Sequence, residues 1–391
     1  MTNSADTNRI GRLDALSDGS LAGLWLYHAF APAEEPWRRL AAHGLLTPYQ
    51  QYGFLHAWWQ ELGRPRGIAP LIVVGHAADG TPLFLWALGT RRHGMVQVAE
   101  AMGGKHANFC FGPWAPAMLA AGGAGLTQAL ALLRAAAPEI DALVLPCQAA
   151  MWEGRVNPFA TRPGVPSPSD AYAVRLEPDP DAYRQRVLSH DARKQMRAKT
   201  RKLAALPGFS TFRAGTSDEA QALITVFLRQ KAAYFDATGI ANPFAEPGAP
   251  EFLRRLGAPG GGLGVYGLEV AGETIAVLGG LGDGRRFSAM FNSYAPEPHG
   301  RLSPGAVLTD QAIADLCRRG YESFDLGTGE ARYKDQFCDQ TIALVDVTIG
   351  FSLPGKLHIA WHDAATRLKR YVKRSPLLAG AAKKARRLLR V

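Results

Sequence analysis

The sequence predicts an α/β fold with mixed sheets, built from two segments that repeat one order of elements. Of its 391 residues, 47% are hydrophobic, which is enough for buried cores, and the length favours two domains over one. A proline-rich stretch, residues 157–180, separates the two segments. Each segment offers a β-hairpin, a helix and a returning strand, so we expect a duplicated architecture.

The first segment begins with two apolar runs, Leu71–Val74 and Leu83–Leu88, around a turn at Asp79-Gly80. Such a pattern is typical of a hairpin. A glycine-bearing loop follows and leads into a helical run, Leu126–Ala137, and an apolar strand, Ala142–Leu145. These elements give the first half of the duplication.

The second segment repeats this order with one additional strand. Its hairpin strands are Gly264–Val270 and Thr274–Leu281, followed by a third strand Phe287–Ala295, a helix Ala306–Arg319 and a strand Tyr321–Leu326. We therefore expect domains at residues 1–165 and 166–355, with a basic helical tail at 356–391.

The net charge of +10 comes from that tail. Asp363 is the last acidic residue, and ten Lys and Arg residues follow it, so the preceding body is neutral. A domain that binds duplex DNA should carry its excess charge on a folded face. The sequence therefore argues against DNA as a partner.

The N-terminus has no apolar core of the kind a secretory signal needs, which predicts a cytoplasmic protein. The four cysteines, Cys110, Cys147, Cys317 and Cys338, lack C-x-x-C spacing. We expect free thiols in a reducing compartment and no bound metal.

A candidate anion site begins at His299, in the run H-G-R-L-S-P-G-A-V-L. Ser303 suits the N-cap of a helix, and Pro304 suits its first position. Gly305 and Ala306 would leave backbone amides unobstructed at the positive end of the helix dipole. Arg301 could reach a phosphate there, although a well-capped helix alone would explain the same residues.

A second candidate is the run F-D-L-G-T-G-E-A-R-Y-K, from Phe324 to Lys334. Ligands of α/β domains usually bind where strands end in this way. Asp325 lies inside the strand, where a carboxylate needs a partner, and Lys334 or Arg332 could supply one.

Together these motifs resemble the CelD-type acetyltransferase branch of the GNAT superfamily, with a two-domain layout like that of the FemAB transferases. The basic helix that begins at Ser189 and the aromatic run Tyr49–Trp59 fit the same pattern. The resemblance implies tandem GNAT-like domains, with residues 1–165 degenerate and 166–355 active.

The resemblance also implies an acyl-CoA co-substrate, most simply acetyl-CoA. Its pyrophosphate would lie on the helix that starts near Pro304, and its pantetheine would run between strands 287–295 and 321–326. The residues expected to bind this co-substrate are Arg301, Ser303, Gly305 and Ala306. Pro304 takes the first glycine position of the superfamily loop and removes one N–H donor.

The chemistry is attack of an amine or hydroxyl on a thioester, which needs alignment, donors for the oxyanion and a route for the proton. Asp325 is our candidate for the proton, Lys334 for charge stabilisation, and Tyr333 or Tyr294 for protonating the thiolate. Arg193, Arg197 and Trp58 are the candidates for the acceptor, a sugar or amino-sugar in exopolysaccharide, cellulose or envelope biosynthesis.

Two other functions stay open: FemAB-like aminoacyl transfer from tRNA, and a non-catalytic scaffold of a polysaccharide-synthesis complex. The tail adds a further alternative. Trp361, Ala365, Leu368 and Val372 form one apolar stripe of a helix with cations on its other faces. The helix either packs on the body or contacts the inner membrane or a synthase complex.

Overall fold

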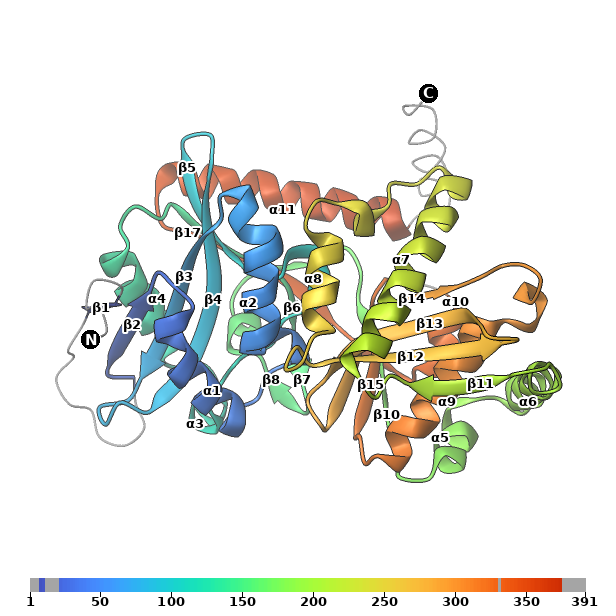
Figure 1. The fold of residues 1–391 in the computed structure, drawn as a ribbon. Helices are drawn as coiled ribbons and strands as arrows, with labels where there is room; N and C mark the ends of the chain where they lie inside the picture. Colours follow the sequence, from blue (N-terminus) through green and yellow to red (C-terminus); the bar gives the residue numbers. More distant parts are fainter. Residues whose placement is uncertain (1–6, 11–20, 330–331, 375–391) are drawn as a thin grey trace. The chain divides into compact units, whose positions relative to one another are not determined.

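The computed structural model describes residues 7–10, 21–329 and 332–374, and these form two compact units (Figure 1). Unit 1 is built from the chain up to Asp170 and from the segment that starts at Ile342. Unit 2 is built from Ala171–Thr341. The fold is α/β with mixed sheets, as the sequence predicts.

The domain boundaries lie elsewhere than at 165 and 355, because the chain returns to unit 1 after completing unit 2. Strand β17 (Leu344–Gly350) pairs antiparallel with β6 (Ala142–Ala149), and helix α11 (Leu353–Arg374) packs against β17. The helical part of the predicted tail therefore belongs to unit 1. Periodicity along the chain could not indicate this, since the paired strands lie about 200 residues apart in sequence.

Unit 1 contains one sheet of eight described strands. In sheet order they are β1 (Thr7–Ile10), β2 (Gly23–Tyr27), β3 (Ala69–His76), β4 (Pro82–His93), β5 (Val96–Ala101), β6, β17 and β9 (Val165–Pro166). Neighbouring strands run antiparallel except β5 and β6, which run parallel. The predicted hairpin is confirmed as β3 and β4, in a register that pairs Val73 with Trp86.

The helices of unit 1 bury aromatic side chains against this sheet. They are α1 (Glu34–His43), α2 (Tyr52–Trp58), α3 (Pro116–Ala120), α4 (Leu126–Ala136) and α11, and a small hairpin of β7 (Met151–Trp152) and β8 (Arg155–Val156) stands beside them. Trp37, Tyr49, Phe84 and Trp114 are almost fully buried. The predicted helix at 126–137 is confirmed as α4.

Unit 2 contains a seven-stranded sheet of the same design. In sheet order its strands are β11 (Ser210–Arg213), β12 (Leu263–Val270), β13 (Glu273–Gly282), β14 (Arg286–Tyr294), β15 (Ser323–Thr328), β10 (Ala171–Arg175) and β16 (Gln340–Ile342). Strands β11 to β14 are antiparallel, β14 and β15 are parallel, and β10 is antiparallel to β15. The predicted hairpin, third strand and returning strand are all confirmed.

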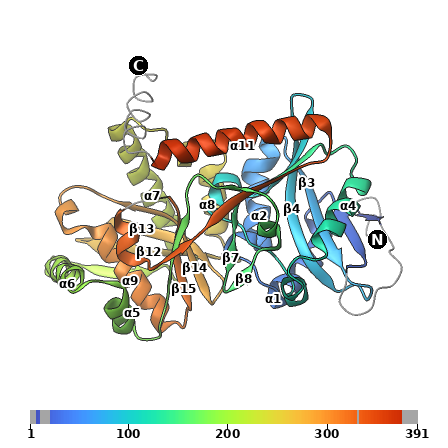
Figure 2. The same ribbon diagram turned by 180° about the vertical axis from the view of Figure 1, so that it is seen from behind.

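Helices cover both faces of the unit 2 sheet (Figures 1 and 2). They are α5 (Pro180–Val187), α6 (His190–Ala204), α7 (Ser217–Thr238), α8 (Ala249–Leu256), α9 (Pro304–Arg318) and α10 (Arg332–Phe337). Leu308 of α9 belongs to the same buried cluster as Phe287 and Phe324. Leu223 of α7 packs at Gly267 on the opposite face, where a β-carbon would meet its side chain at 2.9 Å.

Candidate functional site

The two parallel strands of unit 2 separate soon after they meet. Their pairing consists of Arg286 with Ser323, Phe287 with Phe324, and Ser288 with Asp325. Within the described part of this unit, no backbone hydrogen bond joins Leu326–Thr328 to β14 or to the loop that follows it. We call this opening, bounded by residues 289–294 and 326–328, the unit 2 fork.

The course of β14 explains why the pairing stops. The register between β13 and β14 shifts between Gly279 and Gly280, and Met290 is the extra residue on β14. Such a bulge bends its strand and increases the local twist. Beyond it, β14 remains paired to β13 as far as Tyr294, so β14 follows β13 and leaves β15.

A buried carboxylate joins the two strands at the base of the fork. Ser288 donates its hydroxyl to one carboxylate oxygen of Asp325, and the backbone N–H of Gly327 donates to the other at 3.1 Å. Burial raises the pKa of Asp325 to about 7, and the bonds from Ser288 and Gly327 and the charge of Lys334 limit that rise. This carboxyl therefore titrates near neutral pH.

Lys334 reaches β15 from helix α10. Its Nζ donates to the carbonyl oxygens of Gly327 (3.1 Å) and Thr328 (2.7 Å). Burial lowers the pKa of Lys334 to about 8, against the opposing effects of Cys338 and Asp325. The sequence predicts Lys334 or Arg332 as a partner of Asp325; in the structure Lys334 bonds to the backbone of β15 two and three residues after Asp325.

The start of α9 lies beyond the end of β14. Ser303 occupies the N-cap position with φ of 53°, but its side chain makes no capping bond. Its own N–H donates to Gly300, and its carbonyl accepts from Ala306 and Val307. Fewer amides are open here than the sequence predicts: in the described chain, the N–H groups of Arg301 and Gly305 are the ones between 300 and 307 that make no such bond.

A lysine supplies positive charge at the same place. Nζ of Lys199, on the basic helix α6, donates to Oγ of Ser303 at 2.9 Å. Helix α6 begins as predicted, with Ser189 accepting from the N–H of Ala192. Arg301 is exposed in the short 3-10 turn Gly300–Leu302 that precedes Ser303. Two cations thus flank the N-terminus of α9.

Tyr294 stands at the mouth of the fork. Its side chain is about half exposed. A β-carbon added at Gly305 would lie 3.3 Å from the ring of Tyr294, so the ring covers the first turn of α9. Ala306, in the same turn, packs partly against the core.

The arginines of α6 line a separate hollow of about 300 Å³. Arg193 and Arg197 both line it, and the guanidinium of Arg193 also donates to the carbonyls of Gln185 and Leu188 at the end of α5. Arg184 makes a two-pronged ion pair with the buried Asp310 (3.0 and 2.7 Å), which ties α5 to α9.

The roles expected of Trp58 and Tyr333 stay predictions. Trp58 is buried in unit 1, where its indole N–H lies 3.3 Å from Nδ1 of His106. Tyr333 lies on α10, and its side chain is outside the part that the structure describes. Among described side chains, no group of three or more His, Cys, Asp or Glu could hold a metal ion.

Unit 1 has the corresponding fork, and its own chain fills it. Strands β5 and β6 pair at Val98 with Ala142, Ala99 with Leu143, and Glu100 with Val144. Beyond these pairs, a later segment takes the place of β5 beside β6. The backbone N–H of Cys110 donates to the carbonyl of Cys147, and its backbone carbonyl accepts from the N–H of Ala149, both at 2.9 Å. We call residues 109–114, most of them buried, the plug.

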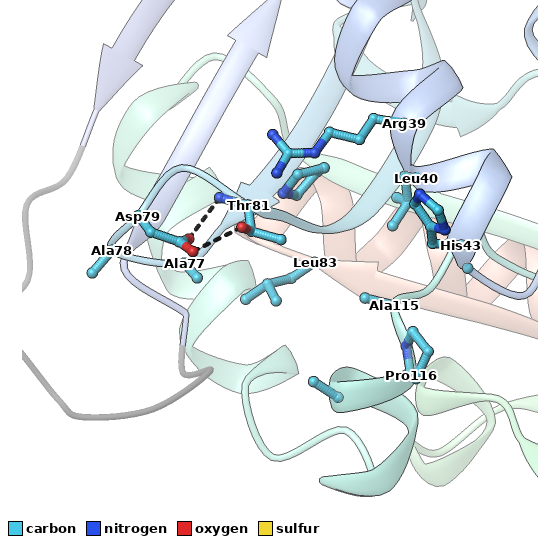
Figure 3. A pocket seen from close by; sticks show the side chains of 13 residues that line it. Arg39, Leu40, His43, Ala77, Ala78, Asp79, Thr81, Leu83, Ala115 and Pro116 are labelled. Carbon is cyan, nitrogen blue, oxygen red and sulfur yellow. Dashed lines mark hydrogen bonds between the residues drawn. The ribbon is translucent and has the colours of Figure 1, made fainter.

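Unit 1 also has an open groove of about 690 Å³, lined in part by Ala115 and Pro116, which follow the plug (Figure 3). Arg39 and His43 of α1 line it together with Asp79 and Thr81 of the β3–β4 turn. The carboxylate of Asp79 accepts from the N–H (2.8 Å) and hydroxyl (2.9 Å) of Thr81, so the turn already uses it. The groove shows no arrangement for acyl transfer.

Three residues at the forks and at the start of α9 were not predicted from the sequence. Ser288 and Cys110 carry no local signal, because their roles depend on strand pairing. Lys199 could have been found, since the basic helix was recognised and only its contact with Ser303 was not.

Comparisons with known proteins agree with this geometry. Residues 190–335, which include α6, the fork and α9, match the family described as acetyltransferase (GNAT) domain. A search of curated proteins finds no match. The CelD-type branch stays a prediction.

Solved structures with low sequence identity share the fold. The C-terminal domain of a proposed lysylphosphatidylglycerol synthetase from Agrobacterium fabrum has a TM-score of 0.52 at 10% identity, over 86% of this chain and 97% of that one. The crystal structure of FemX has a TM-score of 0.50 at 8% identity, over 74% and 90%. The family match of residues 190–335 gives unit 2 a GNAT-type acetyltransferase domain, which supports an acyltransferase.

Proposed function

We propose that unit 2 transfers an acyl group, most simply acetyl, from acyl-CoA to an amine or hydroxyl of a sugar or amino-sugar. The observation that carries this proposal is the open fork beside the N-terminus of α9. A CoA molecule needs a site for its diphosphate and a slot for its pantetheine arm, and the two features lie next to each other.

The diphosphate would be held by charge more than by amides. Lys199, Arg301 and the N–H of Gly305 surround the positive end of α9, where the helix dipole favours an anion. Pro304 offers no N–H, and Lys199 compensates for it with a charged donor. The hydrogen bond to Oγ of Ser303 holds the ammonium group of Lys199 at this position.

The pantetheine arm would take the strand position that β15 leaves vacant. The N–H of Ala295 donates to Ile275 of β13, so alternation along β14 directs the N–H groups of Asn292 and Tyr294 to the other side, toward the fork. An extended arm with amide groups could then bind as an added strand.

The reaction needs two proton transfers: one from the acceptor to a base and one to the thiolate that leaves. The acceptor's nitrogen or oxygen bonds to the thioester carbon, its proton leaves to a base, and the C–S bond breaks to give a thiolate that takes up a proton. Asp325, with a pKa near 7, is our candidate for the base, reached from the fork. Tyr294 or Tyr333 would protonate the thiolate, and Lys334 would stabilise charge.

A CoA-release assay with acetyl-CoA and a panel of amino-sugars, sugars and amines tests this proposal. We expect release that depends on an acceptor and saturates with acetyl-CoA. Asp325→Asn should lower kcat by roughly 100-fold or more. Asp315→Asn is the matched control, because that carboxylate lies on α9, outside the fork, where it accepts from the hydroxyl of Tyr266 on β12. No release with any acceptor would contradict the proposal and favour a non-catalytic scaffold.

Aminoacyl transfer from tRNA is a second candidate. The basic helix α6, with Arg197 and Arg201 beside a hollow of about 300 Å³, would suit a polyanion. The structural likeness to FemX concerns the fold alone. Activity that disappears after ribonuclease treatment would favour this candidate, and activity that persists would favour acyl-CoA. The place of the acceptor in exopolysaccharide or envelope biosynthesis rests on the sequence resemblance.

A further inference from the structure

Helix α11 exposes its apolar side. Five large side chains on it are between 63% and 72% exposed: Leu353, Leu357, Trp361, Leu368 and Tyr371. At 100° per residue their spacing places them within one narrow sector of the helix. The sequence had predicted a stripe that included Ala365 and Val372, but these two residues are half-buried.

The opposite side of α11 is held to unit 1 by Ile359, which packs on a small buried apolar cluster, and by polar contacts. Thr348 donates to the carboxylate of Asp363 (3.1 and 3.2 Å), and Thr366 donates to Asp346 at 3.5 Å. Arg370 pairs with Asp170 at 3.7 Å. These contacts fix the rotation of the helix, so its apolar sector cannot turn inward without breaking them.

This distribution is the reverse of the usual one, in which a surface helix places its apolar side on the core. Contiguous exposed apolar surface of this kind is typical of an interaction site. The apolar sector therefore needs an occupant from outside unit 1.

The charges around the sector indicate which occupant. Three exposed cations lie on α11: Lys356, Arg367 and Lys369. Asp363 is the one acidic residue of α11 in its described range, and its carboxylate accepts the bond from Thr348 on the inner side. The sequence beyond the described helix adds cations and no acid: Lys383, Lys384, Arg386, Arg387 and Arg390. Trp361 and Tyr371 are side chains that suit the boundary between water and hydrocarbon.

We propose that α11 lies in the plane of an anionic lipid bilayer, with Leu353, Leu357, Trp361, Leu368 and Tyr371 inserted below the headgroups and its cations on lipid phosphates. None of the described helices is both long and apolar enough to cross a bilayer. This binding goes beyond acyl transfer and does not depend on it, because it concerns where the enzyme works.

Co-sedimentation of the full chain with vesicles tests the proposal. We expect binding to phosphatidylcholine vesicles that contain 30% phosphatidylglycerol, weaker binding to pure phosphatidylcholine, and partial loss in high salt. Leu357→Ser with Trp361→Ser should weaken binding at least about tenfold. Both side chains are exposed, so the fold should survive. Met95→Ser is the matched control and should bind like the wild type, because Met95 is an exposed apolar residue (92%) on the β4–β5 turn.

Fluorescence supplies a second measurement. Of the eight tryptophans, Trp361 alone is largely exposed, so insertion should shift its emission to shorter wavelength. Trp361→Phe should keep vesicle binding and lose this shift. Three results would overturn the proposal: no binding to anionic vesicles, a double variant that binds like the wild type, or a wild-type dimer that the double variant converts to monomer.

Discussion

The two units build the same fork and use it differently. In each, two parallel strands pair at three positions and then separate. In unit 1 the segment between β5 and α4, residues 102–125, is long enough to send the plug back into the gap, where Cys110 pairs with β6. In unit 2 the segment between β14 and α9, residues 295–303, is short and turns directly into the helix. The length of this segment therefore decides whether a fork is filled as core or stays open as a site.

The third pair of each fork shows the same contrast. In unit 2 it is Ser288 with Asp325, a hydroxyl bonded to a buried carboxylate. In unit 1 it is Glu100 with Val144, with the apolar residue where unit 2 has its carboxylate. The bonded pair of hydroxyl and carboxylate is therefore a feature of the open fork, and the degenerate first domain stays a prediction.

The largest effect should come from truncating one buried aromatic side chain at each fork. Phe109, in the plug, and Phe324, at the second pair of unit 2, are both fully buried. Either Phe→Ala change should lower the free energy of unfolding by about 3–5 kcal/mol, measured by denaturant titration. We expect Phe324→Ala to weaken acetyl-CoA binding as well, and Phe109→Ala to leave it intact. If neither variant folds, Phe109→Leu and Phe324→Leu allow the same comparison with a smaller loss of stability. Equal effects on binding would contradict the separation of roles.

The buried carboxylate should make stability depend on pH. The pKa of Asp325 is raised to about 7 in the folded chain, so its contribution to stability is present below its ordinary pKa of 3.8 and is lost as the pH rises through 7. The free energy of unfolding of the wild type minus that of Asp325→Asn should fall by roughly 3 kcal/mol from pH 4 to pH 7. A difference that does not change with pH would show that the carboxyl is not held as described.

Removing the charge beside Ser303 should have a smaller effect. Lys199→Met should raise the KM for acetyl-CoA about tenfold, the value of one charged hydrogen bond, and should reduce its dependence on salt. Lys194→Met is the control, because that lysine is exposed on the same helix. If both variants lose affinity equally, the basic helix acts only through its overall charge.

The smallest effect should be a shift in the pH profile. The hydrogen bond from Ser288 lowers the pKa of Asp325, so Ser288→Ala should raise it. If Asp325 acts as the base, kcat/KM rises with pH through its pKa, and the variant should move this acidic limb to higher pH by less than about one unit. An unchanged limb would assign the proton to another group.

Local patterns predicted much of the fold. Turn residues between apolar runs identified both hairpins, and Ser189 marked the start of α6. Helix α7 was missed, although its capping box at Thr216 and Glu219 was a readable signal. The return of β17 to unit 1 was not predictable, because its partner β6 lies about 200 residues away in sequence.

The candidate site was predicted in outline. The motif around Asp325 and Lys334 and the helix start at Pro304 were found from residue type and order. The plug, the bond between Ser288 and Asp325 and the turn that occupies the Ser303 amide depend on contacts that no spacing rule encodes.

Calorimetric titration of the full chain with acetyl-CoA tests the central contrast most directly. An open fork in unit 2 and a filled fork in unit 1 predict one site per chain. Gly305→Val, beside Tyr294 at the start of α9, should weaken that site, and Gly125→Val, at the start of α4, should leave it unchanged. Two sites per chain, a site sensitive to Gly125 alone, or no heat at millimolar acetyl-CoA would contradict the account.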